Sequence, residues 1–138
     1  MTRAEIETMI RACYDARHRE NLDEALSFFS PDATFRLVAN PSLPDLSVTL
    51  RGQGELRAGL EALFATWDWH DFPIQRLVID AEVDPHGVVV LSAGTMHHSP
   101  STRQLPLEIV DVLTVQDGKI LDFQEYLDTD LLGKFLTS

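Results

Sequence analysis

Apolar residues recur at helical spacing near the start of the chain, on a face formed by Ile6, Met9, Ile10, Cys13 and Tyr14. Just before this face, Thr2 and Glu5 have the spacing of a capping box, in which each side chain bonds the backbone N–H of the other. The pattern predicts a first helix. Asn21 and Glu24 repeat the signature and predict a second helix over residues 22–29, ended by Ser30-Pro31.

A third helix is predicted after Gly52-Gln53-Gly54, because the residues that follow place an apolar stripe on one face: Leu56, Leu60, Leu63, Phe64 and Trp67. Short strands are predicted over residues 33–39 and 47–51. The segment between them, residues 40–47, contains Pro41 and Pro44 and is expected to be a loop. Residues 67–73 read as an aromatic-rich connection.

The second half of the chain alternates between apolar and polar residues and predicts four strands. Two of them cover residues 74–83 and 88–98, on either side of a type I turn at Asp84-Pro85-His86-Gly87. The other two form a long hairpin over residues 105–128 around Asp117-Gly118, since an Asp-Gly pair tolerates the positive φ of a tight turn. Residues 130–136 could form a last helical turn.

Helices followed by an antiparallel meander indicate an α+β fold in which the helices cover one face of the sheet. The length of 138 residues predicts a single domain over residues 1–138. The net charge of −11 disfavours nucleic acid and anionic membranes as partners, because both require basic patches. With one cysteine, no signal-like start and no membrane-length apolar run, the chain is expected to be cytoplasmic and free of disulfides.

Two acids occupy positions of the hairpin where a half-buried strand usually has apolar residues. Asp111 shares a strand face with Leu107, Ile109, Leu113 and Val115. Glu125 shares one with Leu121, Phe123 and Leu127. Burial would raise the pKa of such a carboxyl and suit it to general acid/base catalysis. The alternatives are a structural role for Asp111, satisfied by an Arg, a Tyr or the backbone, and a place at the pocket rim for Glu125, solvated or paired with Arg36.

His97 and His98 are neighbours on a predicted strand, so their side chains point to opposite faces and cannot bind one metal ion together. No helix carries the His-x-x-x-His spacing of a zinc site, and no metal is expected. A single histidine facing the pocket is the more plausible arrangement, and counting back from Asp111 favours His98.

Several motifs, in order along most of the chain, resemble one known family. They are YDA at 14–16 with NLD at 21–23, FFSPDAT at 28–34, GEL at 54–56, DVLTVQDGKI at 111–120 and EYLD at 125–128. Together they resemble the SnoaL-like branch of the NTF2-like superfamily, whose members have a cystatin-like fold and are relatives of ketosteroid isomerase and polyketide cyclases. The resemblance implies a cone, in which a curved sheet wraps around the N-terminal helices and leaves an apolar pocket. It also implies a homodimer formed through the outer face of the sheet.

The resemblance places Asp111 where the relatives have a protonated, hydrogen-bond-donating aspartate. Leu37 stands where ketosteroid isomerase has its basic carboxylate, and Cys13 stands at the phenol position, one residue before Tyr14. The expected catalytic residues are therefore Asp111, Glu125, Tyr14 and His98, and the expected pocket residues are Trp69, Phe123, Trp67, Leu37 and Ile109. Trp67 also continues the stripe of the third helix and fits a core position.

The function predicted from these features is carboxylate acid/base chemistry on a small apolar molecule, without a cofactor. The reaction would be that of an isomerase, cyclase, dehydratase or hydrolase. The competing prediction, favoured by Leu37 at the base position, is a non-catalytic ligand-binding or dimeric accessory protein with the same fold.

Overall fold

The structure is a computed structural model that describes residues 1–40, 42 and 46–138. Its helices are α1 (Arg3–His18), α2 (Leu22–Ser27), α3 (Gly52–Thr66) and α4 (Thr129–Thr137). Its strands are β1 (Phe29–Val38), β2 (Val48–Arg51), β3 (Trp67–Asp68), β4 (Ile74–Asp80), β5 (His86–His98), β6 (Arg103–Gln116) and β7 (Lys119–Leu127). No helix among these residues is long and apolar enough to cross a membrane.

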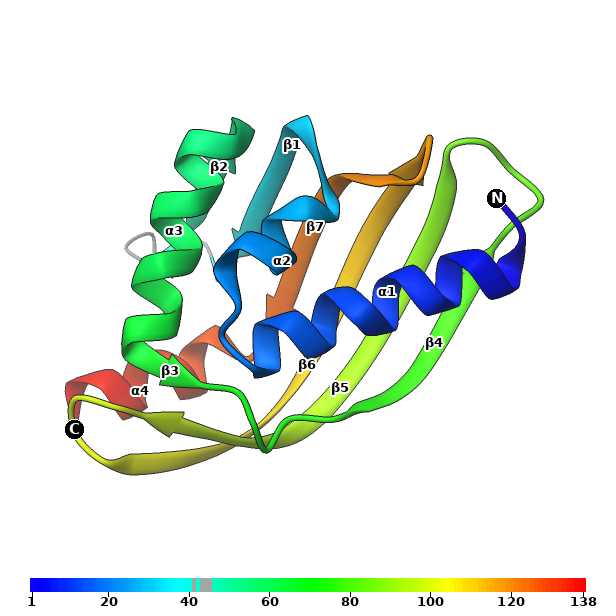
Figure 1. Cartoon of the computed structure of the whole chain (residues 1–138). Helices are drawn as coiled ribbons and strands as arrows, with labels where there is room; N and C mark the ends of the chain where they lie inside the picture. Colours follow the sequence, from blue (N-terminus) through cyan, green and yellow to red (C-terminus); the bar gives the residue numbers. More distant parts are fainter. Residues whose placement is uncertain (41, 43–45) are drawn as a thin grey trace.

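The strands form one seven-stranded, strongly curled sheet in the order β2-β1-β7-β6-β5-β3, with β4 also paired to β5. The pair β1–β7 is parallel and the other pairs are antiparallel. Helix α1 crosses the concave face of the sheet, α3 stands over its β1–β2 edge and α4 lies near β3 at one end (Figure 1). The predicted α+β cone is therefore confirmed.

The local signals at two predicted element ends are present in the structure. The Thr2 hydroxyl accepts a hydrogen bond from the backbone N–H of Glu5, and the Glu5 carboxylate accepts one from the N–H of Thr2. At the tip of the β6–β7 hairpin, Asp117 and Gly118 have φ values of 52° and 75°. The capping box and the Asp-Gly turn are confirmed.

The predicted second helix is two residues too long, and Ser30-Pro31 does not end it. Helix α2 ends at Ser27, and β1 begins at Phe29 and runs through Pro31. Phe29 pairs with Ile120 of β7 and is buried, so pairing to the sheet and burial of the ring outweigh another helical turn. A local propensity signal could not report this pairing, because Ile120 is distant in the sequence.

Two other regions differ from the sequence prediction, and a third lies partly outside the described residues. The 67–73 connection contains the two-residue strand β3, which pairs with His97 and His98. His86 and Gly87, predicted to be turn residues, begin β5 and pair with Val115 and Thr114. Residues 41 and 43–45 of the predicted 40–47 loop lie outside the described residues.

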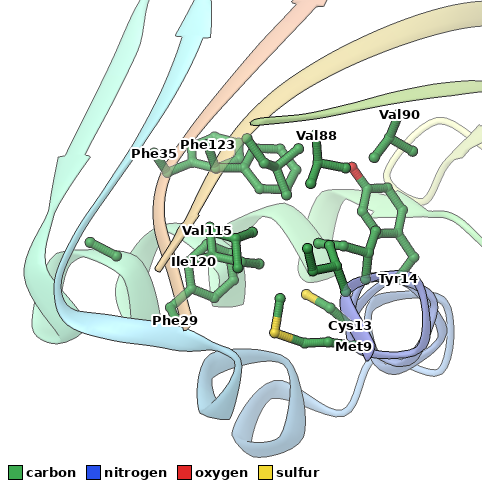
Figure 2. Close-up of a cluster of buried hydrophobic side chains, with 14 of the residues drawn as sticks. Met9, Cys13, Tyr14, Phe29, Phe35, Val88, Val90, Val115, Ile120 and Phe123 are labelled. Carbon is green, nitrogen blue, oxygen red and sulfur yellow. The ribbon is translucent and has the colours of Figure 1, made fainter. Parts of the chain in front are cut away.

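The core lies between α1 and the concave face of the sheet. Figure 2 shows Met9, Cys13 and Tyr14 of α1 facing Phe29 and Phe123. The Phe123 ring packs against those of Phe35, Phe29 and Tyr14, at centroid separations of 5.1, 6.1 and 6.2 Å. Cys13 is fully buried in this cluster, and burial raises the pKa of its thiol to about 12, so it acts as a small apolar residue.

The connection after β3 crosses close to β5 at Gly94. The Asp71 carbonyl accepts a hydrogen bond from the Thr95 N–H at 2.9 Å. A Cβ at Gly94 would lie 2.1 Å from the Asp71 carbonyl oxygen and 2.9 Å from Phe72 Cα. The missing side chain therefore lets this connection pack on the sheet, and the connection carries Trp69 and Phe72.

Gly94→Ala should lower the free energy of unfolding by about 1–3 kcal/mol, because the new methyl group overlaps backbone that has to move. Gly87→Ala, also in β5, is the matched control, since a Cβ there meets no heavy atom within 4 Å among the described residues. It should change stability by about 0.5 kcal/mol or less. Urea unfolding of both variants measures the difference, and equal losses would contradict the close approach at Gly94.

Candidate active site

Asp111 lies on the inner face of β6, as the alternation predicts. Its side chain is 2% exposed, and the neighbours in its strand alternate between buried and exposed. It is the register partner of Val90 in β5 and of Glu125 in β7. The carboxyl therefore sits in the middle of the sheet, on the concave side that α1 covers.

Tyr14 reaches this carboxyl from α1. Its hydroxyl group donates a hydrogen bond to Asp111 Oδ2 at 2.5 Å. Figure 2 shows the Tyr14 hydroxyl pointing away from α1, toward Val88 and Val90 of β5. Burial and the nearby Asp111 raise the pKa of Tyr14 well above its ordinary value, so the phenol keeps its proton. Tyr14, and not its neighbour Cys13, is therefore the group that contacts Asp111.

Glu125 is buried directly across from Asp111 and not at the pocket rim. It is 4% exposed, and its Oε2 lies 3.7 Å from Arg17 Nη2. The predicted alternative pairing with Arg36 is wrong. The parallel β1–β7 register puts Leu37 beside Glu125 and Arg36 beside Gln124, and Arg36 donates to the Gln124 side chain.

Arg17 is the site residue that the sequence reading missed. It is 4% exposed, and its guanidinium carbon lies 5.1 Å from the ring centroid of Trp69, 5.4 Å from that of Phe123 and 5.5 Å from that of Tyr14. Its place on the buried face could have been predicted from the sequence, because residue 17 is four after Cys13 and three after Tyr14. An arginine on an apolar helical face signals a buried counter-charge.

Asp111, Tyr14, Glu125 and Arg17 form one buried cluster, in which neighbouring charges shift the pKa values of the members. Burial, and then the neighbouring Glu125, raise the pKa of Asp111 well above its ordinary value of 3.8, so Asp111 holds a proton. Burial acts to lower the pKa of Arg17, but the charge of Glu125 keeps it above its ordinary value. The cluster thus contains the cation Arg17 and the protonated Asp111, and the Glu125 carboxyl lies beside both. Tyr14 donates to Oδ2 of this carboxyl, and a side-chain hydrogen bond with Glu125 is a further cause of the raised pKa of Asp111.

Two cavities of different character meet this cluster. The smaller, of about 10 Å³, is lined by Tyr14, Arg17, His18, Trp69, Phe72, Ser92, Ile109 and Asp111. The larger, of about 240 Å³, is mostly apolar and is lined by Phe35, Leu37, Val48, Leu50, Gly59, Leu60, Ala62, Leu63, Thr66, Trp67 and Glu125. Asp111 therefore borders a space for one water-sized group, and Glu125 borders a space for a small organic molecule.

The predicted pocket residues divide between these places. Trp69 and Ile109 line the smaller cavity, and Trp67 and Leu37 line the larger one. Phe123, which was also predicted to shape the pocket, lines neither cavity and is fully buried among aromatic rings of the core. Among the described residues, Asp111 Oδ1 and Glu125 Oε2 have no hydrogen-bond partner. Glu125 Oε2 nevertheless faces the charge of Arg17 Nη2, at 3.7 Å.

His98 is not near Asp111, which corrects the sequence expectation. It pairs with Arg103 at the far end of β5, eight residues beyond Val90, the partner of Asp111. Its Nδ1 lies 2.7 Å from Ser101 Oγ, and its ring packs on Trp67. The prediction of His98 by counting back from Asp111 was wrong because the 99–102 connection is tight. Strands β5 and β6 therefore pair along their length, and His98 lies at the end next to the connection. In the described part of the chain, no three His, Cys, Asp or Glu side chains are placed to hold a metal ion.

A family model described as a SnoaL-like domain matches residues 10–123. The chain belongs to this family. Among solved structures, an NTF2-like protein of unknown function from Burkholderia pseudomallei is 20% identical, covers 100% of both chains and has a TM-score of 0.81. A search of curated proteins gives no match.

Two further solved structures share the fold with this SnoaL-like chain. A putative isomerase from Bacillus subtilis is 14% identical over 100% of this chain and 98% of its own, with a TM-score of 0.80. An epoxide hydrolase from M. tuberculosis is 18% identical over 97% and 90%, with a TM-score of 0.73. At such identities the likeness shows a common architecture.

Asp111→Asn should change how stability depends on pH. Because folding raises the pKa of Asp111, the folded chain keeps a proton that the unfolded chain releases above about pH 4. The stability contributed by this group is full below that pH and is lost as pH rises toward the raised pKa, by up to about 1.4 kcal/mol per pH unit. The amide has no such proton and still accepts from Tyr14.

Urea unfolding of both proteins between about pH 4 and 8 tests this. The free energy of unfolding of the variant, minus that of the wild type, should increase with pH. A difference that is independent of pH would show that the Asp111 pKa is not raised by folding.

Proposed function

We propose that this SnoaL-like protein is an enzyme that moves protons on a small apolar molecule with the carboxyl pair Asp111–Glu125. The observation that carries the proposal is that two buried acids lie side by side in unequal surroundings. Asp111 is held as an acid by burial, and Glu125 faces the fixed cation Arg17. A carboxyl that holds its proton, beside a second carboxyl that faces a cation, can supply an acid and a base at the same pH.

In the proposed reaction the apolar body of the substrate occupies the larger cavity, where Leu37, Leu60 and Leu63 surround it. The Glu125 carboxylate takes a proton from the substrate and returns one to another of its atoms, so that the enzyme is unchanged at the end. Arg17 stabilises the carboxylate form, and Asp111, hydrogen-bonded to Tyr14, holds the second proton. Isomerisation, cyclisation, dehydration and hydration all use such transfers, and carboxyl groups perform them without a cofactor.

A second candidate function is ligand binding without catalysis. Leu37 favours it, because this residue lines the larger cavity beside Glu125 and stands where ketosteroid isomerase, which the chain resembles, has its base. In that case Glu125, which faces Arg17, would orient the ligand in the larger cavity.

Proton exchange between D₂O and small apolar ketones, epoxides and alcohols, followed by NMR, separates the two functions. Glu125→Gln and Asp111→Asn should each lower the turnover of an active compound by about 10²-fold or more. Glu108→Gln, on the exposed face of β6, is the matched control and should leave it unchanged. Compounds that stabilise the wild type but are never turned over would favour the binding function. Turnover unaffected by Asp111→Asn would remove Asp111 from the mechanism.

We also propose that the chain forms a homodimer through the outer face of β6 and β7. Val112 and Tyr126 are each 39% exposed on that face, and Val110 is the register partner of Tyr126. Sedimentation equilibrium should give twice the chain mass of 15.5 kDa. Val112→Glu should shift the protein toward the monomer, because it puts a charge in the apolar contact, and a wild-type mass of one chain would contradict the dimer.

A further inference from the structure

The two acids of the cluster open to different spaces. Asp111 borders the smaller cavity and Glu125 borders the larger one, and no described residue lines both. The two carboxyl groups are nevertheless register partners on adjacent strands, and their side chains are hydrogen-bonded. A proton on this pair can therefore be reached from two sides, from the smaller cavity through Asp111 and from the larger cavity through Glu125.

The smaller cavity has the lining of a site for one water molecule. It lies between α1, the connection after β3, and strands β5 and β6, and its volume of about 10 Å³ is just enough for one water molecule. Two of its buried side chains have a polar atom that no described residue bonds, Trp69 Nε1 and Ser92 Oγ. The Asp111 carboxyl keeps lone pairs beyond its hydrogen bonds with Tyr14 and Glu125. A water molecule here accepts from the indole and donates to the hydroxyl and the carboxyl, and it adds no charge to the buried cluster.

The smaller cavity reaches the surface at His18. This half-buried residue and Tyr14 line both the cavity and a surface groove, whose other lining residues are Arg11, Asp15, Pro73 and Ile74. Burial, and then the charge of Arg17, lower the pKa of His18 below its ordinary value of 6.5. Its ring is therefore neutral at neutral pH, and it readily gives up a proton that it takes from solvent in the groove.

We propose that a water molecule in the smaller cavity passes protons between solvent at His18 and the two acids. The water gives a proton to Asp111 as Asp111 gives its own to the Glu125 carboxylate, and His18, protonated from the groove, replaces the proton of the water. Each transfer breaks one O–H or N–H bond and forms another, and the reverse transfers return the proton to solvent. Ser92 and Trp69 are positioning residues that hold the water.

This route would let the acids exchange protons with solvent while a substrate fills the larger cavity. That use rests on the proposed function, whereas the route itself does not. The Tyr14 hydroxyl proton reports on the route without any substrate, because it lies in the hydrogen bond to Asp111 and exchanges with water through the same carboxyl. Its NMR signal is the low-field resonance that Tyr14→Phe removes, and saturation transfer from water or line broadening gives its exchange rate.

A pair of variants that fill one cavity each separates the two possible paths. Ser92→Thr keeps the hydroxyl and adds a methyl group to the smaller cavity, where it should exclude the water. Leu63→Phe fills part of the larger cavity and is the matched control. Exchange should be about tenfold slower in Ser92→Thr, because hydrogen bonds of the water are lost, and unchanged in Leu63→Phe. An unchanged rate in Ser92→Thr, or equal slowing in both variants, would overturn the proposal.

His18→Phe gives an independent result if Ser92→Thr does not fold. It removes the group that carries protons to the groove and should slow the exchange by about tenfold or more, whereas an unchanged rate overturns the route. Crystals of the wild type should show an ordered water within hydrogen-bond distance of Ser92 Oγ and the Asp111 carboxyl, and a cavity without one would also overturn it. If no compound is ever turned over, the proposed function fails while these outcomes keep their meaning.

Discussion

The structure depends on the neutrality of a buried group of four side chains. Arg17 faces Glu125, Asp111 holds its proton, and Tyr14 donates to it. Two carboxylates and one cation in this apolar core would leave a net charge out of water, which is strongly unfavourable. The proton on Asp111 is therefore part of what stabilises the fold, and it is the proton that the proposed reaction would use.

The four groups come together because the spacing of side chains along α1 is similar to the spacing between strands β6 and β7. Tyr14 and Arg17 are three residues apart on α1, which puts their Cβ atoms about 5–6 Å apart. Asp111 and Glu125 are register partners on adjacent strands, which lie about 4.8 Å apart. A helix crossing the concave face can therefore place one side chain over each strand. Tyr14 contacts Asp111, and Arg17 lies over Glu125.

The same arrangement divides the interior into two spaces with different chemistry. Asp111 and the donors around it border a space for a single small group, and Glu125 borders an apolar space for a molecule. Gly94 helps to form the smaller of these spaces although it does not line it. Its lack of a side chain lets the connection with Trp69 and Phe72 pack on the sheet. The aromatic rings around Arg17 exclude water and attract the cation.

Most helices and strands, the fold class and the inward direction of Asp111 and Glu125 can be predicted from the sequence, because helical periodicity, strand alternation and the Asp-Gly turn are local. The sequence also places Arg17 on the buried face of α1, although the prediction did not include it. Three outcomes came from tertiary contacts alone: Arg17 and not Arg36 faces Glu125, Tyr14 and not His98 contacts Asp111, and Phe29 joins the sheet. Those outcomes depend on strand register and on how α1 crosses the sheet, which are set by contacts between residues far apart in the chain.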